Sequence, residues 1–168
     1  MNSLLVTYIL QTEKWTFPEL FETKNRIYTF LNPVSYLIAL ENKSLFEQFD
    51  GIFADGSLLV SAIRLVYGKR VTRRSFDMTS LAPGLLKYLM GRRKTLYIVA
   101  SGQEQVECSV RIFQEQYPEL RIAGFRNGYF SSDAEMSKEA SHIVELNPDF
   151  LIVGMGALMQ EKFLLKVK

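Results

Sequence analysis

Asp55 combines a residue type and a position that suit acid–base chemistry. It follows the short apolar run Ile52 to Ala54 and precedes Gly56 and the amphipathic stretch Ser57 to Tyr67. If the run is a buried strand and the stretch a helix, Asp55 lies at the carboxyl end of a strand, where open α/β sheets bind ligands. A carboxylate there is a candidate general base. The alternative is an ordinary N-cap, because aspartate is a common residue before a helix.

A group of cations follows that helix. Lys69 and Arg70 are interpreted as a solvated basic loop, whereas Arg73 and Arg74 are each either a solvated charge or a phosphate ligand. Arginine suits a pyrophosphate because its planar fork bonds two oxygens at once and stabilises charge on a departing phosphate. Asp77 is expected to cap the next helix.

The loops after the predicted strands hold the other candidate residues. They are Asn32-Pro33, Asp55-Gly56, Ser101-Gly102-Gln103 and Gly154-Met155-Gly156, with Gln160-Glu161 one turn further on. Small residues in such turns let backbone amides at a helix N-terminus approach an anion, as in α/β proteins that hold phosphates. Each loop alone is a weak signal, but together they predict a nucleotide crevice.

Several other chemistries are disfavoured by absent motifs. Walker A is missing, and Gly154-x-Gly156 is followed three residues later by Met159, so the dinucleotide fingerprint fails. No Asp-x-Asp pair and no Gly-x-Ser-x-Gly elbow occurs, and His142 is the only histidine. We expect His142 to be a solvated or half-buried helix residue. The sequence therefore predicts neither a metal site nor a cofactor.

Strand-like and helix-like segments alternate along most of the chain. Helical spacing of apolar residues marks Ser57 to Tyr67, the stretch around Val106 to Phe113, and Asp133 to Leu146, which Ser132 and Glu135 open as a capping box. The strand-like runs are Leu4 to Leu10, Ile27 to Leu31, Ile52 to Ala54, Leu96 to Ala100, Arg121 to Phe125 and Phe150 to Val153. Nearly all-apolar strands predict an α/β, Rossmann-like fold, with helices on both faces of a mainly parallel sheet.

Size and composition set further limits. The chain has 168 residues, 48% of them hydrophobic, which favours one domain over residues 1–168. Its 20 basic and 18 acidic residues are mixed along the chain, which argues against nucleic-acid binding. Cys108 is the only cysteine, which excludes an internal disulfide and suits a reducing compartment. We expect this thiol to be a core residue. Met1 to Gln11 has no basic leader, and no apolar run reaches the ~18 residues of a spanning helix, so we expect a cytoplasmic chain.

Four motifs in order resemble one family. They are Ala54-Asp55-Gly56, the basic segment leading to Ser75-Phe76-Asp77, Asn127-Gly128-Tyr129-Phe130, and Gly154-Met155-Gly156 followed by Gln160-Glu161. Their order and spacing resemble the WecG/TagA/CpsF glycosyltransferases over about Asn32 to Phe163. The four together are far more specific than any one of them.

The resemblance implies an inverting, metal-independent transfer of an N-acetylhexosamine from a UDP-sugar to a polyprenyl-pyrophosphate-linked sugar. The donor sugar is typically N-acetylmannosamine or its uronic acid, and the products are teichoic acid linkage units, capsules and exopolysaccharides. The family's general base falls on Asp55 and its phosphate-directed arginine on Arg73, with Arg74 as the alternative. Its substrate-binding asparagine falls on Asn32 and the Gln-Glu pair on Gln160 and Glu161. Backbone amides near Gly102 and Gly156 are expected to stabilise the leaving diphosphate.

The chain departs from the family pattern in three places. Phe30 stands where the family often has threonine, and Leu158 and Met159 stand where it usually has proline and a basic residue. Family members also continue with a tail rich in arginine and aromatics that meets the membrane, so we interpret the chain as lacking that tail. The full-length protein is then expected to be peripheral at the inner face of the cell membrane. Phe163, Leu164 and Leu165 are expected to be exposed, where they could pack in a homo-oligomer.

Two rival functions differ in class. A non-catalytic UDP-binding module of a polysaccharide assembly complex would share the same loops. A Rossmann-like methyltransferase is disfavoured, because no glycine-rich loop follows the first predicted strand.

Overall fold

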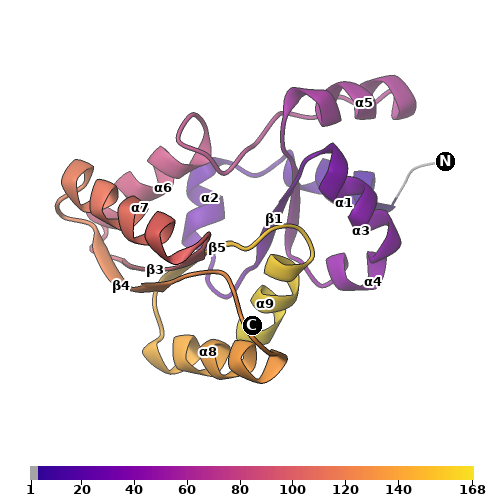
Figure 1. Cartoon of the computed structure of the whole chain (residues 1–168). Helices are drawn as coiled ribbons and strands as arrows, with labels where there is room; N and C mark the ends of the chain where they lie inside the picture. The colour runs from indigo at the N-terminus through magenta and orange to yellow at the C-terminus, as the bar shows by residue number, and fades with distance from the viewer. Residues whose placement is uncertain (1–3) are drawn as a thin grey trace. The chain divides into compact units, whose positions relative to one another are not determined.

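Parallel strands alternate with helices in the computed structural model, which describes residues 4–168 (Figure 1). The strands are β1 (Tyr28–Leu31), β2 (Gly51–Ala54), β3 (Thr95–Ala100), β4 (Arg121–Arg126) and β5 (Phe150–Gly154). The helices are α1 (Leu4–Thr12), α2 (Phe17–Glu22), α3 (Pro33–Glu41), α4 (Lys43–Phe46), α5 (Ser57–Tyr67), α6 (Leu81–Gly91), α7 (Gln103–Gln116), α8 (Asp133–Leu146) and α9 (Met159–Val167). The predicted α/β class with parallel strands is confirmed.

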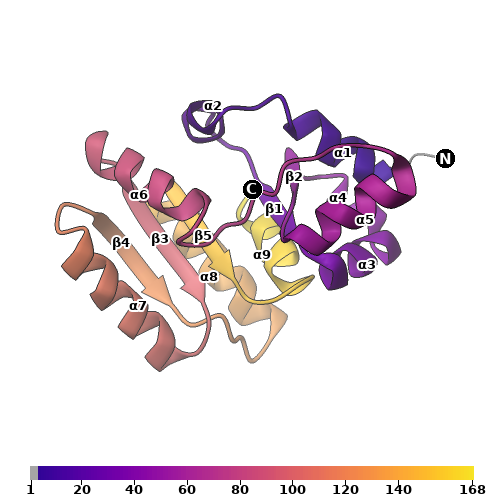
Figure 2. The ribbon, with the colours of Figure 1, turned by 90° about the horizontal axis from the view of Figure 1, so that it is seen from above.

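The chain divides into two compact units. Unit 1 comprises Met1–Gly84 together with Lys168, and unit 2 comprises Leu85–Val167. Unit 1 contains the parallel pair β1–β2, with Leu31 opposite Ala54 at its carboxyl end. Unit 2 contains a parallel sheet in the order β4-β3-β5, seen from above in Figure 2. The strands thus form two sheets rather than the single sheet predicted, and the assignment of one domain to residues 1–168 stays a prediction.

Helix α1 corrects the first sequence-based assignment, because the predicted strand Leu4 to Leu10 is helical. Its buried residues, Leu5, Val6, Ile9 and Thr12, recur at helical spacing and form one face. The Thr12 hydroxyl donates to the Ile52 carbonyl at 3.2 Å, which ties the end of α1 to β2. A short apolar run alone does not distinguish a buried strand from a buried helix.

Aromatic rings fill the core of unit 1 beside β2. The ring of Phe53 stacks on Phe30 with centroids 5.1 Å apart and meets Tyr28 at 5.8 Å and Trp15 at 6.4 Å. Phe30 also contacts Phe76 at 5.9 Å. Phe30, which departs from the family pattern, therefore belongs to an aromatic cluster whose pair geometry stabilises the fold.

Strand β3 is the centre of unit 2 and is covered on both faces. Tyr97 and Val99 pack with Met136 of α8 and Phe163 of α9, while α7 lies on the other side of the sheet (Figure 1). Phe163 is completely buried, with its ring centroid 5.4 Å from that of Phe130. The expectation that Phe163 is exposed is therefore wrong, because α9 turns this ring into the core; Leu164 and Leu165 are half-buried.

Two predictions about single residues have opposite outcomes. His142 is exposed on α8, with its ring beside Tyr97, as predicted. Cys108 is exposed on α7, so the expectation of a core thiol is wrong. The buried face of α7 is formed by Val106 and Val110, and Cys108 lies on a different face of the helix.

Local hydrogen bonds fix the ends of α8 and of the central strands. Ser132 Oγ accepts from the Glu135 amide at 3.1 Å, as the predicted capping box requires, but the Glu135 carboxylate accepts from the Ser131 amide at 2.7 Å instead of that of Ser132. At the amino ends of β3 and β5, the Asp149 carboxylate accepts from Lys94 Nζ at 2.6 Å and from the Thr95 amide at 2.8 Å. Lys94 and Thr95 together lower the pKa of Asp149.

Over residues 4–168, every helix is too short or too polar to cross a bilayer.

Candidate active site

Asp55 lies at the carboxyl end of β2, where the sequence predicted it. Its amide donates to the Leu31 carbonyl at 2.8 Å, which extends the pairing with β1 by one residue. The N-cap of α5 is Gly56, whose φ of 82° lies in the left-handed region, so Asp55 is not the cap. The half-buried Asp55 carboxylate instead accepts a short hydrogen bond from the hydroxyl of Ser75 through Oδ1.

Ser75 is a buried residue held by its own backbone. The Ser75 carbonyl accepts from the Leu81 amide at 3.1 Å, and the amide of the preceding Arg74 donates to the Ala54 carbonyl at 2.9 Å. The segment containing Ser75 therefore runs beside the end of β2 and directly into α6. This arrangement fixes one carboxylate oxygen of Asp55, and within residues 4–168 the other oxygen, Oδ2, accepts no hydrogen bond.

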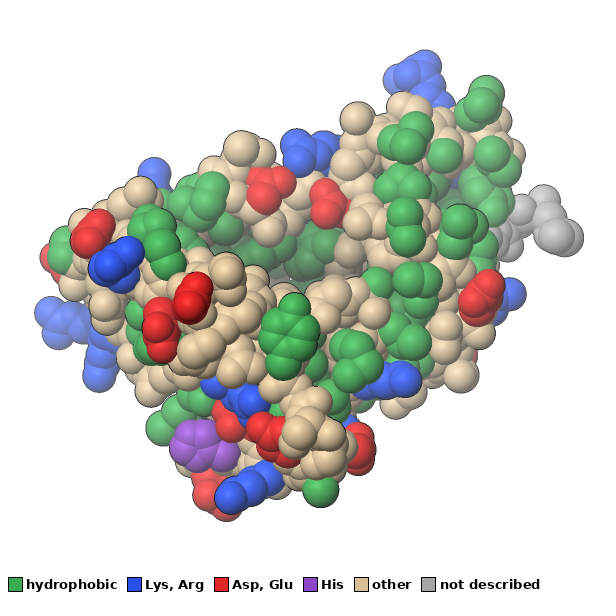
Figure 3. Space-filling model, in the orientation of Figure 1, with side chains coloured by type: hydrophobic (Ala, Val, Ile, Leu, Met, Phe, Trp, Pro, Cys, Tyr) green, Lys and Arg blue, Asp and Glu red, His purple; other side chains and the backbone are tan. Residues whose placement is uncertain are grey.

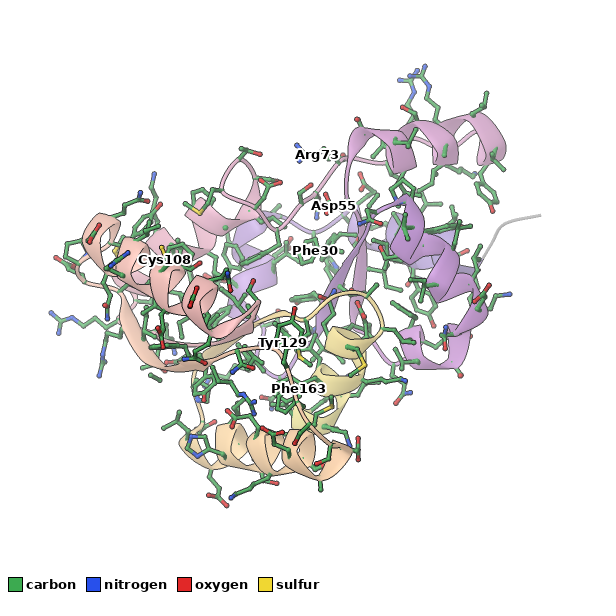
Figure 4. All side chains as sticks on the ribbon, viewed as in Figure 1. Phe30, Asp55, Arg73, Cys108, Tyr129 and Phe163 are labelled. Carbon is green, nitrogen blue, oxygen red and sulfur yellow. The ribbon has the colours of Figure 1, made fainter. Side chains whose placement is uncertain are left out.

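The two candidate arginines have different surroundings. Arg74 donates to the carbonyls of Thr12 at 3.1 Å and Glu13 at 3.4 Å, and its guanidinium lies 5.6 Å from the centre of the Phe53 ring. Arg73 is exposed, and among residues 4–168 its ion-pair partner is Asp77 alone, at 3.0 Å. Figure 4 shows Arg73 and Asp55 on the same side of unit 1. The guanidinium of Arg74 is thus bonded within unit 1, whereas that of Arg73 is exposed to solvent.

Asp77 shapes the turn before α6. Its carboxylate accepts from the Thr79 amide at 2.7 Å and the Thr79 hydroxyl at 2.6 Å, and these bonds, with the charge of Arg73, lower its pKa. Helix α6 begins only at Leu81. The carboxylate of Asp77 thus caps this turn rather than the helix itself.

Asn32 is the counterpart of Asp55 on the neighbouring strand. Because Leu31 pairs with Ala54, Asn32 and Asp55 both come directly after the last pair of the β1–β2 ladder. Asn32 Oδ1 accepts from the amides of Val34 at 3.0 Å and Ser35 at 2.9 Å, which makes Asn32 the N-cap of α3. Asn32 remains exposed at the same edge as Asp55.

In unit 2, backbone bonds join the loops at the carboxyl ends of the strands. The Ser101 amide donates to the Gly154 carbonyl at 3.1 Å, and the Gly128 amide donates to the Ser101 carbonyl at 2.9 Å. A Cβ at Gly128 would lie 2.9 Å from Met155 Cγ, so a side chain there would have to displace that of Met155. Gly102 is the N-cap of α7, and among the described residues no side chain caps this helix end, where the first amides of a helix lack partners within the helix.

The loop before α9 is shaped by a buried carboxylate. Gly156 has a φ of 86°, and Leu158, unusually for a branched residue, has a φ of 72°. The buried Glu161 carboxylate accepts from the Leu158 amide at 2.7 Å and from Gln160 Nε2 at 3.0 Å. Glu161 therefore holds the loop in its left-handed turns, while Gly156 is exposed and Gln160 half-buried.

Arg126 supports the Asn127–Phe130 motif, a role that the sequence did not predict. The guanidinium of Arg126 lies 3.9 Å over the Phe130 ring, pairs with Glu135 at 3.1 Å, and donates to the Tyr129 carbonyl at 2.9 Å. Hydrogen bonds from Ser131, with Arg126, lower the pKa of Glu135 to about 2. The position of Arg126 directly before this glycine- and aromatic-containing motif is the sequence feature that could have indicated its role.

Each unit therefore presents its own group of predicted residues. Unit 1 holds Asn32, Asp55, Arg73 and Arg74, and unit 2 holds Gly102, Gly156, Gln160 and Glu161. Across the described part of the chain, no three histidine, cysteine, aspartate or glutamate side chains are grouped to hold a metal ion.

Comparisons with known proteins agree with the motif resemblance. The model of the glycosyl transferase WecG/TagA/CpsF family matches residues 11–168. The "UDP-Gal:alpha-D-GlcNAc-diphosphoundecaprenol beta-1,4-galactosyltransferase" of Shigella boydii is 31% identical over 142 residues, 84% of this chain and 59% of its own length. The "N-acetylglucosaminyldiphosphoundecaprenol N-acetyl-beta-D-mannosaminyltransferase" of Bacillus subtilis (strain 168) is 23% identical over 168 residues, 98% of this chain and 62% of its own length. The chain thus spans about three fifths of the length of these curated relatives.

Proposed function

We propose, because the chain belongs to the WecG/TagA/CpsF family of glycosyl transferases, that it transfers a hexosyl group from a UDP-sugar to a sugar carried on polyprenyl diphosphate. The observation that carries this proposal is the Asp55 carboxylate at the end of β2. One of its oxygens is fixed by Ser75 and the other is left to accept a proton.

In the proposed mechanism, a hydroxyl oxygen of the acceptor sugar attacks the anomeric carbon of the donor from the face opposite UDP. The hydroxyl proton passes to Asp55 Oδ2 as the new carbon–oxygen bond forms. The bond between the anomeric carbon and the β-phosphate oxygen breaks, and UDP leaves with its electron pair. This single displacement inverts the configuration at the anomeric carbon.

Charge on the departing diphosphate requires stabilisation by cations or amides. We assign this role in unit 1 to Arg73, because its guanidinium is exposed and its one ion pair among the described residues is with the surface carboxylate of Asp77. In unit 2, we assign donor binding to the amides at Gly102 and Gly156 and to Gln160, with Glu161 as the residue that orients the loop. Asn32 is assigned to substrate binding beside Asp55.

The identity of the donor sugar is a further part of the proposal. Both relatives are named for an acceptor made of N-acetylglucosamine on diphosphoundecaprenol, but one is named for galactose and the other for N-acetylmannosamine. We propose an N-acetylhexosamine donor of the N-acetylmannosamine type, with UDP-galactose as the competing substrate, and a role in cell-surface polysaccharide synthesis.

The test replaces Asp55 with asparagine and measures both transfer and binding. Transfer of either sugar to a lipid-diphosphate-linked N-acetylglucosamine should fall ~10²–10⁴-fold, because the base is lost. Calorimetric binding of UDP should stay within a factor of two or so, since Asp55 contacts the acceptor and not UDP. Asp133→Asn, an exposed aspartate of α8, is the matched control and should change neither quantity.

Two outcomes would overturn the assignment. Equal losses of UDP binding and transfer in Asp55→Asn would make Asp55 a structural residue. UDP binding by the unsubstituted protein with no transfer of either sugar would favour the non-catalytic nucleotide-binding module.

A further inference from the structure

Helix α5 is apolar on more than the face that it buries. Leu59 and Ile63 pack into unit 1, but Leu58, Leu65 and Val66 are exposed, Leu65 over 87% of its surface. A helix in a water-facing position normally carries polar residues opposite its buried stripe. Within residues 4–168, the second apolar stripe of α5 is thus left exposed.

Helix α3 continues this surface. Val34 and Leu37 are exposed over 68% and 62% of their surfaces. Because α3 follows β1, α5 follows β2, and the two strands pair in parallel, both helices begin at the edge that carries Asp55. Figure 3 shows hydrophobic side chains in a band that runs from α5 down over α3. We call the five residues Val34, Leu37, Leu58, Leu65 and Val66 the α3–α5 face.

The charge beside this face has one sign. From Ser57 to Arg74 the chain has five arginine and lysine residues and no aspartate or glutamate. Arg64, Lys69 and Arg70 are exposed, and within residues 4–168 they form no ion pair. Apolar side chains bordered by unpaired cations match a membrane surface, where the apolar groups insert and the cations bind anionic headgroups.

We propose that the α3–α5 face docks unit 1 on an anionic lipid bilayer. The proposal rests on the proposed function, because a polyprenyl-linked acceptor is held in a membrane and the face begins at the edge that carries Asp55. A second copy of the chain is a poorer occupant. A symmetric dimer through this face would bring the two sets of cations toward each other, at an electrostatic cost.

The test measures binding of the protein to vesicles by sedimentation, without any sugar substrate. Vesicles of phosphatidylcholine with 30% phosphatidylglycerol should bind the protein, and pure phosphatidylcholine vesicles should bind it roughly a hundredfold more weakly. Replacing Arg64, Lys69 and Arg70 together by glutamine should cause a similar loss, since each cation near an anionic surface contributes about fivefold. The double variant Leu65→Ser, Val66→Ser should lose roughly tenfold or more.

The control is Val144→Ser, which changes an exposed apolar residue of α8 in unit 2 and should bind vesicles normally. UDP binding should be unchanged in all variants, which shows that they are folded. Equal binding of the variants and the unsubstituted protein to anionic vesicles would overturn the proposal. So would a concentration-dependent dimer in gel filtration that Leu65→Ser, Val66→Ser abolishes, because the face would then join two copies.

The transfer assay tests the proposed function separately from the membrane-docking proposal. Loss of transfer in Asp55→Asn with normal vesicle binding would support both proposals. Vesicle binding by a protein that shows no transfer would leave the docking surface in place and overturn only the glycosyl transfer.

Discussion

Replacement of Phe163 by alanine is expected to destabilise unit 2 strongly. The ring is completely buried among side chains of β3, α8 and the chain before α8. Replacing a buried phenylalanine by alanine costs about 3–5 kcal/mol, depending on how far the surroundings collapse into the space. Here the neighbouring Phe130 ring is stacked under Arg126 at 3.9 Å, and Arg126 is held by Glu135. The cavity therefore cannot easily close, and we expect a loss in the middle of that range rather than at its lower end, about 4 kcal/mol.

Urea unfolding followed by circular dichroism measures this loss. With a slope of about 2 kcal/mol per molar urea, a loss of about 4 kcal/mol moves the midpoint down by about 2 M. Tyr129→Ala is the control, because this exposed aromatic side chain lies only one residue from Phe130, and its removal should change stability by less than about 0.5 kcal/mol. Equal midpoints for Phe163→Ala and Tyr129→Ala would show that α9 does not pack on the core as described.

Three further substitutions test individual contacts. Arg74→Ala should lower the free energy of unfolding by about 1.5–3 kcal/mol, since the charged hydrogen bonds to the Thr12 and Glu13 carbonyls are lost. An unchanged urea midpoint would refute the role of Arg74 in stabilising unit 1. The pKa of Asp149 is lowered in the folded protein, so its contribution to stability is present at neutral pH and is lost as the pH falls through that folded value. Asp149→Asn should therefore make the free energy of unfolding fall less steeply at acid pH. An unaltered dependence of stability on pH would contradict this. Gly124→Ala should lower the free energy of unfolding by about 1–3 kcal/mol, because its Cβ would lie 2.5 Å from the Tyr97 ring, whose hydroxyl donates to Glu139. An unchanged melting temperature would show that the ring moves freely.

The sequence predicted the strands better than the N-terminal region. Five of the predicted runs correspond to β1–β5. Strands β2 and β3 are buried and almost uniformly apolar, as expected of parallel strands, whereas β4 alternates between exposed and half-buried residues. The strand predicted over Leu4 to Leu10 is helix α1, because a short apolar run does not distinguish a buried strand from a buried helix; the spacing of Leu5, Ile9 and Thr12 is helical. The division of the strands into two sheets depends on long-range pairing, which no local pattern encodes.

The positions of the candidate residues at strand ends could be predicted, but their hydrogen-bond partners could not. Asp55 was placed at a strand end by local signals alone, and its neighbour Asn32 followed from the same logic. The hydroxyl of Ser75 reaches Asp55 across 20 residues, and Arg74 reaches Thr12 across 62, so neither bond could be predicted from local spacing. The predicted substrate-binding role of Glu161 stays a prediction; the bond from the Leu158 amide to its buried carboxylate depends on a left-handed turn that the sequence did not indicate.

Because Cys108 is exposed, a dye attached to it could be used to measure its distance from Trp15 in solution. This only thiol lies on the surface of α7 in unit 2, and the only tryptophan, Trp15, belongs to the aromatic cluster of unit 1. A thiol-reactive dye at Cys108 would accept excitation energy from Trp15 without any engineered residue. The efficiency of that transfer, with and without UDP, would report how the separation of the two units responds to nucleotide.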